Sequence, residues 1–490
     1  MNIVLISTYE LGRQPFGLVS PAAWLGKRGH RVVCMDLTRQ QLDEQAIQQA
    51  QLIAIYLPMH TATRLAAQLI PSLRERNPQA HLCCHGLYAP MNAEYLRRLG
   101  VTTILGGEFE AGLVALAARL SGTQVVGDAV PVGAAEKLIS LERLAFEVPD
   151  RSGMPPIEKY AHLVMPGGRY RLVGSTEASR GCKHRCRHCP IVPVYNGVFR
   201  IVGRDVVMAD IRQQVAAGAQ HISFGDPDFF NGIGHATALM EAFHSEFPDV
   251  TYDVTIKIEH LRKHKEYVPR LRDTGCLFVI SAVESVDDQV LEHLDKGHTR
   301  GDFLTVARDF RSLGMTLHPT FVPFSPWTTL QGYIDLLSVL RNEQLIENVT
   351  SVQLGIRLLI PAGSRLLELE EIRKIVQPFD AQSLVFPWRH SDERIDHLSA
   401  TIQKIAAGAD QQKQSRFTTF ERIWEAAHTA AGWYAPYPSL EPTAAPAVPF
   451  LSEPWYCCAE PTQDQLVSIG STRQETRVPA ERLAGIQGFV

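Results

Sequence analysis

The sequence has little net charge and no long hydrophobic run. Its 490 residues carry 48 Lys and Arg against 52 Asp and Glu, a formal net charge of -4, so a basic nucleic-acid-binding surface is not expected. No uninterrupted apolar stretch approaches the roughly 18 residues that a membrane helix needs. The apolar start, residues 1–17, lacks a basic segment and a cleavage site, which predicts a first strand instead of a signal peptide. We therefore expect a cytoplasmic protein with no membrane and no nucleic-acid partner.

Cysteine is also scarce, with nine residues. A reducing cytoplasm disfavours a disulfide framework, so the cysteines indicate metal or redox chemistry. Cys83 and Cys84 fall in an apolar run that predicts a buried strand, where they are interpreted as small core residues.

The chain is too long for one core and divides by pattern. Residues 1–125 alternate short apolar runs with helical stretches, which predicts a doubly wound, Rossmann-type parallel sheet of five strands. Residues 126–169 are irregular and are interpreted as a linker. A second alternation over 170–389 predicts six βα units, a partial TIM-type (β/α)6 barrel. Residues 390–440 predict helices, and the Pro-rich residues 441–490 predict an extended tail.

Three cysteines follow the first predicted barrel strand in a C-x3-C-x2-C run, "CKHRCRHC", formed by Cys182, Cys186 and Cys189. Chemistry in such barrels sits at this rim. Three thiolates can ligate three irons of a [4Fe-4S] cluster and leave the fourth iron open. Zinc with His184 or His188 as fourth ligand is the alternative. Structural zinc usually staples a small module, so the position inside a strand-helix repeat favours iron and sulfur.

The string "RGCKHRCRHC" resembles the signature of the radical S-adenosylmethionine (SAM) enzymes, although His188 stands where that family usually has an aromatic residue. Matching segments follow in order as "FGDPDFFN", "TIKIEHL", "SAVESVDDQVLEHLDKG" and "QLGIRLLIP", so the resemblance covers roughly residues 170–365. It implies that SAM is contacted by Gly225, Asp226, Asp228, Lys257 or Glu259, Glu284, Ser285 and Arg357. A plain turn is the alternative at "GDP", and an exposed strand position is the alternative at Lys257.

The resemblance also implies a mechanism and its cofactors. The open iron of the cluster would chelate the amino and carboxylate groups of SAM, and one electron would cleave a carbon–sulfur bond of the sulfonium. An electron donor such as flavodoxin or ferredoxin is then a required partner. Most members form the 5'-deoxyadenosyl radical, and a minority release the 3-amino-3-carboxypropyl group. With iron assigned, His184 and His188 are interpreted as spacers.

A doubly wound domain before such a barrel resembles the cobalamin-dependent branch of the family. The segment "ILGGEFEAGLVALA" is similar to the Gly-Glu-x-Glu segment that ends the cobalamin-type domain. The Asp-x-His-x-x-Gly motif is missing, and the loop "TYELGRQPFG" after the first strand has no histidine. Cobalamin can bind without that ligand, but the sequence favours a domain that only shapes the active site.

A second cysteine pair, Cys457 and Cys458, stands in the tail as "WYCCAEP". Adjacent thiolates form a soft chelating site. The string resembles the CUAEP/CCAEP-tail family, which is similar to the radical SAM enzyme of arsinothricin biosynthesis. That resemblance implies transfer of the 3-amino-3-carboxypropyl group to arsenite, with a carbon–arsenic bond formed as in hydroxyarsinothricin synthesis. Cys276 is a candidate third thiol, although a core role is favoured.

Two other functions remain open from the sequence. One is a cobalamin-dependent methyltransferase or rearrangement enzyme that uses the 5'-deoxyadenosyl radical. The other is a metalloid or redox sensor in which the vicinal thiols act as a switch.

Overall fold

A computed structural model describes residues 1–122, 136–434, 437 and 448–453. The N-terminal domain is built on a parallel sheet in the order β2-β1-β3-β4-β5-β6. Its strands are β1 (Asn2–Ser7), β2 (Arg31–Asp36), β3 (Leu52–Tyr56), β4 (His81–His85), β5 (Thr103–Gly107) and β6 (Ile139–Ser140). The short β6 comes from the predicted linker and adds a sixth strand to the five that were expected.

Helices cover both faces of this sheet because its strands are apolar on both sides. Ile3, Leu5 and Cys83 pack with one helix layer, whereas Val4 and Cys84 pack with the other, as period-2 alternation requires. The first layer is α1 (Phe16–Gly26) and α5 (Glu110–Ser121); the second is α2 (Glu44–Gln49), α3 (His60–Arg76) and α4 (Ala93–Arg98). Cys83 and Cys84 are fully buried core residues, as predicted.

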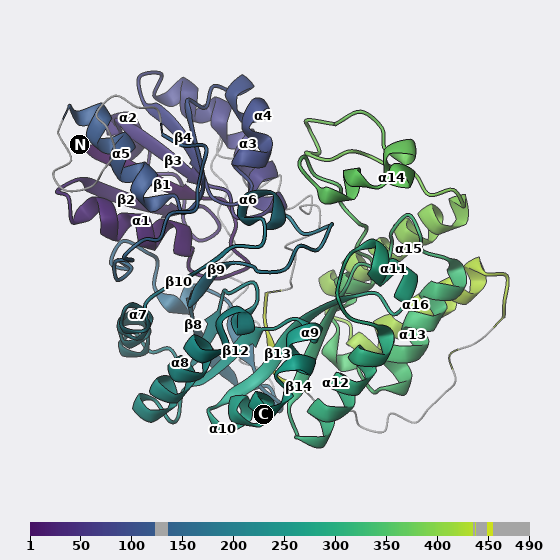
Figure 1. The fold of residues 1–490 in the computed structure, drawn as a ribbon. Helices are drawn as coiled ribbons and strands as arrows, with labels where there is room; N and C mark the ends of the chain where they lie inside the picture. The colour runs from purple at the N-terminus through teal and green to yellow at the C-terminus, as the bar shows by residue number, and fades with distance from the viewer. Residues whose placement is uncertain (123–135, 435–436, 438–447, 454–490) are drawn as a thin grey trace.

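The second domain is a curled half-barrel with the strand order β14-β13-β12-β11-β8-β7-β15. Its parallel strands are β8 (Tyr170–Thr176), β11 (His221–Phe224), β12 (Thr251–Thr255), β13 (Cys276–Glu284) and β14 (Thr316–Phe321). The antiparallel β7 (His162–Val164) and β15 (Phe450–Leu451) extend the β8 edge. The described part of the predicted tail therefore supplies an edge strand instead of remaining a free arm. Figure 1 shows the half-barrel below the N-terminal sheet.

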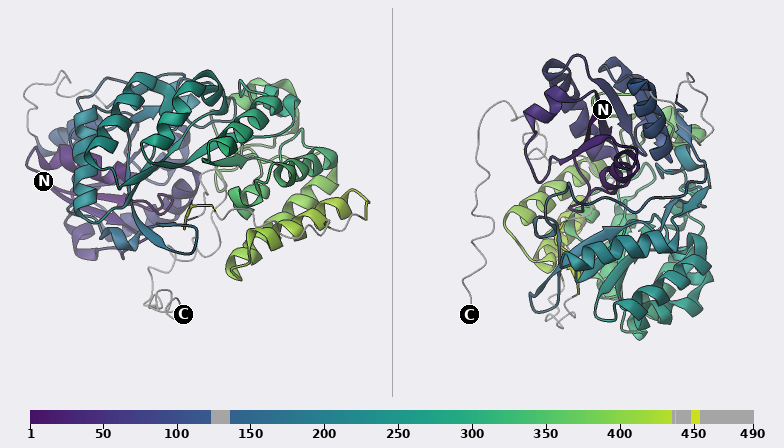
Figure 2. Two further views of the ribbon diagram at one scale, coloured as in Figure 1. Left: turned by 90° about the horizontal axis from the view of Figure 1, so that it is seen from below. Right: turned by 90° about the vertical axis from the view of Figure 1, so that its left-hand side faces the viewer.

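Helices alternate with these strands and are followed by a helical segment. The barrel helices are α7 (Arg204–Ala216), α8 (Ile233–Glu246), α9 (Ile258–Lys263), α10 (Val268–Asp273), α11 (Asp288–His293), α12 (Arg300–Ser312) and α13 (Leu330–Asn342). After them come α14 (Glu370–Ile375), α15 (Glu393–Gln411) and α16 (Arg416–Ala430). In the left view of Figure 2, α15 and α16 lie at the end of the molecule away from the N-terminal domain. The predicted α/β class with a half-barrel and a helical C-terminal part is confirmed.

The sixth barrel unit differs from the expected strand. Residues Ser351–Leu354 form a short 3-10 helix, and a single parallel bridge, Phe324 to Arg357, stands where a ladder was predicted. The physical reason lies in Arg357, whose guanidinium donates to Asp396 of α15 at 2.6 Å and stacks on Trp388. The C-terminal helices therefore hold this segment in place of a neighbouring strand.

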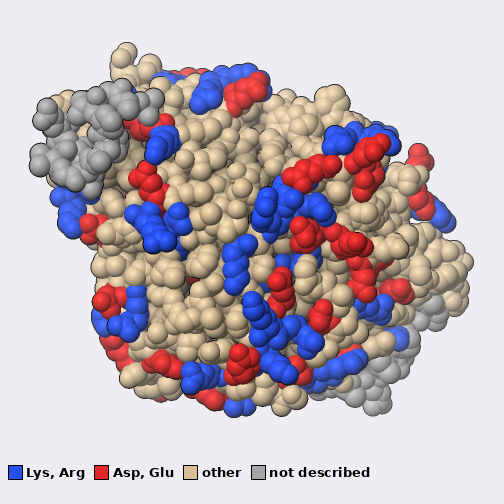
Figure 3. All heavy atoms as spheres, in the orientation of Figure 1, with Lys and Arg blue, Asp and Glu red and all other residues tan. Residues whose placement is uncertain are grey.

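Basic and acidic side chains are interspersed over the face of the molecule drawn in Figure 3. Among the described residues, no helix combines the length and the apolar character needed to cross a membrane.

Candidate active site

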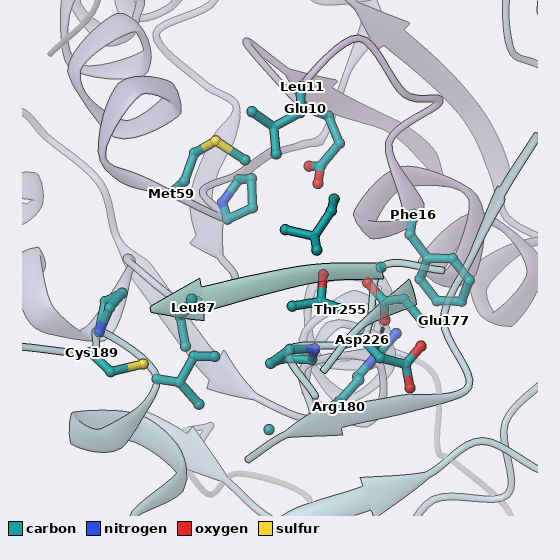
Figure 4. A pocket seen from close by; sticks show the side chains of 18 of the residues that line it. Glu10, Leu11, Phe16, Met59, Leu87, Glu177, Arg180, Cys189, Asp226 and Thr255 are labelled. Atoms are coloured by element: carbon teal, nitrogen blue, oxygen red, sulfur yellow. Dashed lines mark hydrogen bonds and ion pairs between the residues drawn. The ribbon is translucent and has the colours of Figure 1, made fainter. Parts of the chain in front are cut away.

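A cavity of about 360 Å³ lies between the two domains (Figure 4). Its upper wall comes from the loops after β1, β3, β4 and β5, and its lower wall from the carboxyl ends of the barrel strands. Ligands of open α/β sheets and of TIM-type barrels bind at such strand ends. The strand ends of the two sheets thus face each other across one cavity, so both domains contribute residues to a single site.

The cysteine loop begins directly after β9 (Ser179–Gly181) and reaches this cavity at Cys189. Cys186 is buried, and the Cys189 amide donates to its carbonyl at 3.2 Å. Burial raises the pKa of Cys182 to about 11 and that of Cys189 further, and the neighbouring thiols add to both shifts. Cys182 and Cys189 each interact electrostatically with Cys186, so the three side chains form a donor set that iron can occupy by displacing protons. The residues present therefore fit a three-cysteine iron–sulfur cluster.

Glu284 ends β13 beside the cysteine loop and lines the cavity. Its backbone has φ +69°, a left-handed conformation that is strained for a non-glycine residue and that often marks functional sites. His188 Nε2 lies 3.1 Å and Lys296 Nζ 3.3 Å from Glu284 Oε1. Burial alone would raise the pKa of Glu284, but Lys296 and His188 outweigh it and lower the pKa to about 2. Glu284 is thus a charged acceptor at neutral pH.

Arg180, two residues before Cys182, ties the cysteine loop to the N-terminal domain. Its guanidinium donates to Glu110 at 2.6 and 2.9 Å, to Glu177 at 2.8 Å and to Glu108 at 3.3 Å. The side chains of Arg180, Glu108 and Glu110 are at most 7% exposed. Glu108 also accepts from the hydroxyl of Tyr195, in α6 (Val192–Tyr195). After α6 the chain pairs β10 (Phe199–Ile201) with β9, which completes the loop.

Two buried acids in the cavity wall have raised pKa values. Burial, followed by the charge of Glu177, raises the pKa of Glu10 to about 8. Burial likewise raises the pKa of Asp226 to about 7, although its carboxylate accepts from Ser179 Oγ at 2.6 Å. Glu10 Oε2 has no hydrogen-bond partner among the described residues. The cavity therefore offers a protonated carboxyl group at neutral pH.

The structure brings some of the predicted SAM residues together and not others. Gly225, Asp226 and Glu284 line the cavity. Ser285 does not, and its hydroxyl accepts from the Asp287 amide. Lys257 precedes α9 and pairs with Glu259 at 3.0 Å.

Two further candidates, Asp228 and Arg357, lie outside the cavity wall. Asp228 accepts from the Phe230 amide and lies 3.5 Å from His184 Nε2. The guanidinium of Arg357 is engaged by Asp396 and by the Trp388 carbonyl, so its predicted pairing with the SAM carboxylate is not supported by this geometry.

The interpretation of the two loop histidines as spacers is wrong, because both make specific contacts. His188 bonds Glu284, and His184 Nε2 lies 3.2 Å from His260 Nε2. Sequence reasoning also missed Arg180 and Lys296. The segments "GGEFE" and "LDKG" carried signals for them, but the partner of each charge was visible only in three dimensions.

The predicted tail thiols, Cys457 and Cys458, lie outside the described residues. Cys276 is buried on β13, and its Sγ lies 3.3 Å from the Phe278 carbonyl oxygen, consistent with the favoured core role.

Comparison with known proteins assigns the class of the second domain. Residues 176–335 match the model of the Radical SAM superfamily, so the chain contains a radical SAM domain. A bacteriochlorophyllide d C-8(2)-methyltransferase of Chlorobaculum tepidum is 23% identical over 259 residues, which cover 48% of this chain and 55% of that protein. The chain thus spans about half the length of this relative.

Solved structures extend the likeness to both domains. The cobalamin-dependent SAM radical enzyme OxsB, with aqua-cobalamin and SAM bound, aligns with a TM-score of 0.64 at 14% identity, over 83% of this chain and 66% of OxsB. The radical SAM methyltransferase TsrM from Kitasatospora setae, with cobalamin and a [4Fe-4S] cluster bound, aligns with a TM-score of 0.53 at 16% identity, over 70% of each chain. At these identities the likeness establishes the fold.

Proposed function

We propose that the protein is a radical SAM enzyme that transfers a carbon group of SAM to a substrate held between its two domains. The observation that carries this proposal is the cavity itself, which joins Cys189 of the cysteine loop to the strand ends of both sheets. A site closed from two sides excludes water. Chemistry with reactive carbon radicals requires this exclusion.

In this proposal the chain's own residues bind and orient the reactants. Cys182, Cys186 and Cys189 would hold the cluster. When bound, the cluster would supply the one electron needed for reductive cleavage of a carbon–sulfur bond of SAM. Glu284, fixed by Lys296, accepts hydrogen bonds from the amino group or hydroxyls of SAM. The apolar side chains of the upper wall then keep water from the reacting carbon (Figure 4).

Methyl transfer with cobalamin as second cofactor is one candidate route. The loops after β1 and β3 line the cavity, and they flank the point where the strand order reverses, where flat cofactors bind doubly wound sheets. Leu11, Met59 and Leu87 give this wall an apolar surface that suits a corrin face. Among the described lining residues the N-terminal domain offers no histidine or cysteine, so the cofactor would be held by contact. OxsB and TsrM, both solved with cobalamin, support a cofactor that the sequence disfavoured.

Transfer of the 3-amino-3-carboxypropyl group to arsenite is the second candidate. Glu453, the last described residue before the tail cysteines, accepts from the hydroxyl of Tyr9 at 3.3 Å. Tyr9 precedes the cavity residues Glu10 and Leu11. Cys457 is four residues further along the chain, and an extended chain of that length spans about 14 Å. The contact of Glu453 with the residue before Glu10 supports the proposed role of the two thiols in presenting thiophilic arsenic to the cavity.

The arsenic route consumes no net electrons, because the electron given to SAM is returned. The lone pair of arsenic(III) would trap the carbon radical, and the arsenic(IV) centre would then return one electron. Methylthioadenosine and an arsenic(V) amino acid are the products. Cobalamin-dependent methyl transfer would give S-adenosylhomocysteine instead.

Anaerobic incubation of the reconstituted protein with SAM and a reductant distinguishes these routes. Parallel samples contain arsenite, cobalamin, both or neither, and the adenosine products are identified by mass spectrometry. Arsenite-dependent methylthioadenosine supports the arsenic route, and cobalamin-dependent S-adenosylhomocysteine supports methyl transfer. No SAM cleavage by a protein with an intact cluster would contradict the enzyme proposal and favour a sensor.

A further inference from the structure

Three polar side chains from three separate elements converge beside the cysteine loop. His184 belongs to that loop, Asp228 follows β11, and His260 lies in α9. One potential ligand atom from each lies within 4.8 Å of the other two. None of the three lines the cavity between the domains, so they form a group apart from the proposed SAM site.

This group is buried and has fewer hydrogen bonds than its polar atoms require. The side chains of Asp228 and His260 are 1% exposed, and that of His184 is 11% exposed. Asp228 Oδ2 lies 2.7 Å from His260 Nδ1. Neither of these two atoms has a hydrogen bond of regular geometry among the described residues. Buried polar atoms without partners are uncommon and point to a missing ion or water.

The contact between the two imidazole rings limits what can lie between them. Their Nε2 atoms face each other at 3.2 Å, and two lone pairs at that distance repel unless a proton or a metal ion lies between them. Two nitrogen ligands of a tetrahedral zinc ion, each about 2.0–2.1 Å from it, are separated by about 3.3–3.4 Å. Asp228 Oδ2 lies 3.5 Å from His184 Nε2 and 2.7 Å from His260 Nδ1, so a carboxylate oxygen borders both rings.

We propose that His184, Asp228 and His260 bind one divalent transition-metal ion of the zinc class, separate from the iron–sulfur cluster. Two histidines and one carboxylate form a ligand set that zinc and non-haem iron both use. Glu259 Oε2 lies 3.4 Å from His184 Nδ1 and is half-buried, but it pairs with Lys257 and stays outside the ligand set. The ion would fix the cysteine loop to the loop after β11 and to α9.

Metal analysis of the cluster-loaded chain tests this site. After incubation with zinc and exhaustive dialysis, we expect one zinc per chain in addition to the cluster iron. The variants His260→Gln and Asp228→Asn should lose that zinc. The control His264→Gln, which alters another partly buried histidine next to α9, should keep it. A variant with Cys182, Cys186 and Cys189 all changed to alanine should also keep it, which separates this site from zinc bound by the thiols.

Cobalt(II) provides a second readout that does not depend on variants at the site. In the triple-alanine variant, bound cobalt should show tetrahedral ligand-field absorption without a thiolate charge-transfer band. Failure of the unaltered chain to retain zinc or cobalt, or equal retention by His260→Gln, would overturn the proposal and leave a shared proton between the rings. These results do not involve SAM cleavage, so this site and the proposed function can fail separately.

Discussion

Arg180 and Glu110 form a doubly hydrogen-bonded ion pair in the interface between the two domains. The guanidinium belongs to the strand that leads into the cysteine loop, and the carboxylate begins α5 of the N-terminal domain. Their side chains are 7% and 0% exposed. Burial alone would raise the pKa of Glu110, but the charge and hydrogen bonds of Arg180 outweigh it and lower the pKa. The domain interface and the cluster loop are therefore coupled through this buried charge pair.

Replacing Glu110 by alanine should destabilise the protein strongly. The change removes two of the four hydrogen bonds that Arg180 donates and leaves its guanidinium with Glu108 and Glu177 only, and a hydrogen bond to a charged group contributes about 1.5–3 kcal/mol. The matched control Glu94→Ala removes the partner of Arg98 from a pair that is 57% and 88% exposed, and exposed pairs contribute about 0–1 kcal/mol. Thermal unfolding of the cluster-loaded proteins measures the difference. Equal midpoints for the two variants would show that the Arg180 pair does not hold the domains together.

Each single change Cys182→Ala, Cys186→Ala or Cys189→Ala should abolish the four-iron cluster, because each thiolate ligates one iron. Cys276→Ala removes a buried thiol from β13 and should leave the cluster intact. Iron and sulfide analysis after anaerobic reconstitution measures both outcomes. A full complement of four irons in any of the three variants would contradict the assignment of its cysteine.

Neutralising Glu284 should weaken SAM binding. A hydrogen bond to a charged group contributes about 1.5–3 kcal/mol, so Glu284→Gln is expected to raise the dissociation constant of SAM roughly tenfold to a hundredfold. Glu292→Gln, an exposed change on the neighbouring α11, is the control. Equilibrium dialysis with the cluster-loaded protein measures both constants. Unchanged affinity in Glu284→Gln would limit Glu284 to holding Lys296 and His188.

The sequence predicted the periodic parts of the molecule well. The strands of both domains are short apolar runs between helical stretches, and their spacing alone indicates parallel sheets. The three cluster cysteines are contiguous in the chain, so their spacing and position were visible as well. Contacts between distant segments were not predictable from the sequence. The partner of Arg180 in α5, Glu110, lies 70 positions earlier, and no local pattern reveals such a pairing.

The predictions of a strand around Arg357 and of spacer roles for His184 and His188 were wrong for the same reason, namely contacts between distant segments. The run around Arg357 has the apolar composition of a strand, but Asp396 and Trp388 from the C-terminal segment hold it in another conformation. His184 and His188 read as spacers because the cysteines alone explained the motif. Their partners, His260 and Glu284, lie 76 and 96 positions away, so tertiary packing decides their roles.

The buried acid Glu10 should make the stability of the protein depend on pH in an unusual direction. Its pKa rises from 4.5 to about 8 on folding, chiefly through burial. Between about pH 5 and 8 the folded chain therefore holds a proton that the unfolded chain has released, and stability falls as pH rises through this window. In Glu10→Gln this loss is absent, so its stability relative to the unaltered protein should increase by up to roughly 1.4 kcal/mol per pH unit. Unfolding midpoints of both proteins, measured from pH 5 to 8.5, test the expectation, with Glu158→Gln as an exposed control that should follow the unaltered protein. Parallel pH profiles for Glu10→Gln and the unaltered protein would show that Glu10 is ionised in the folded state.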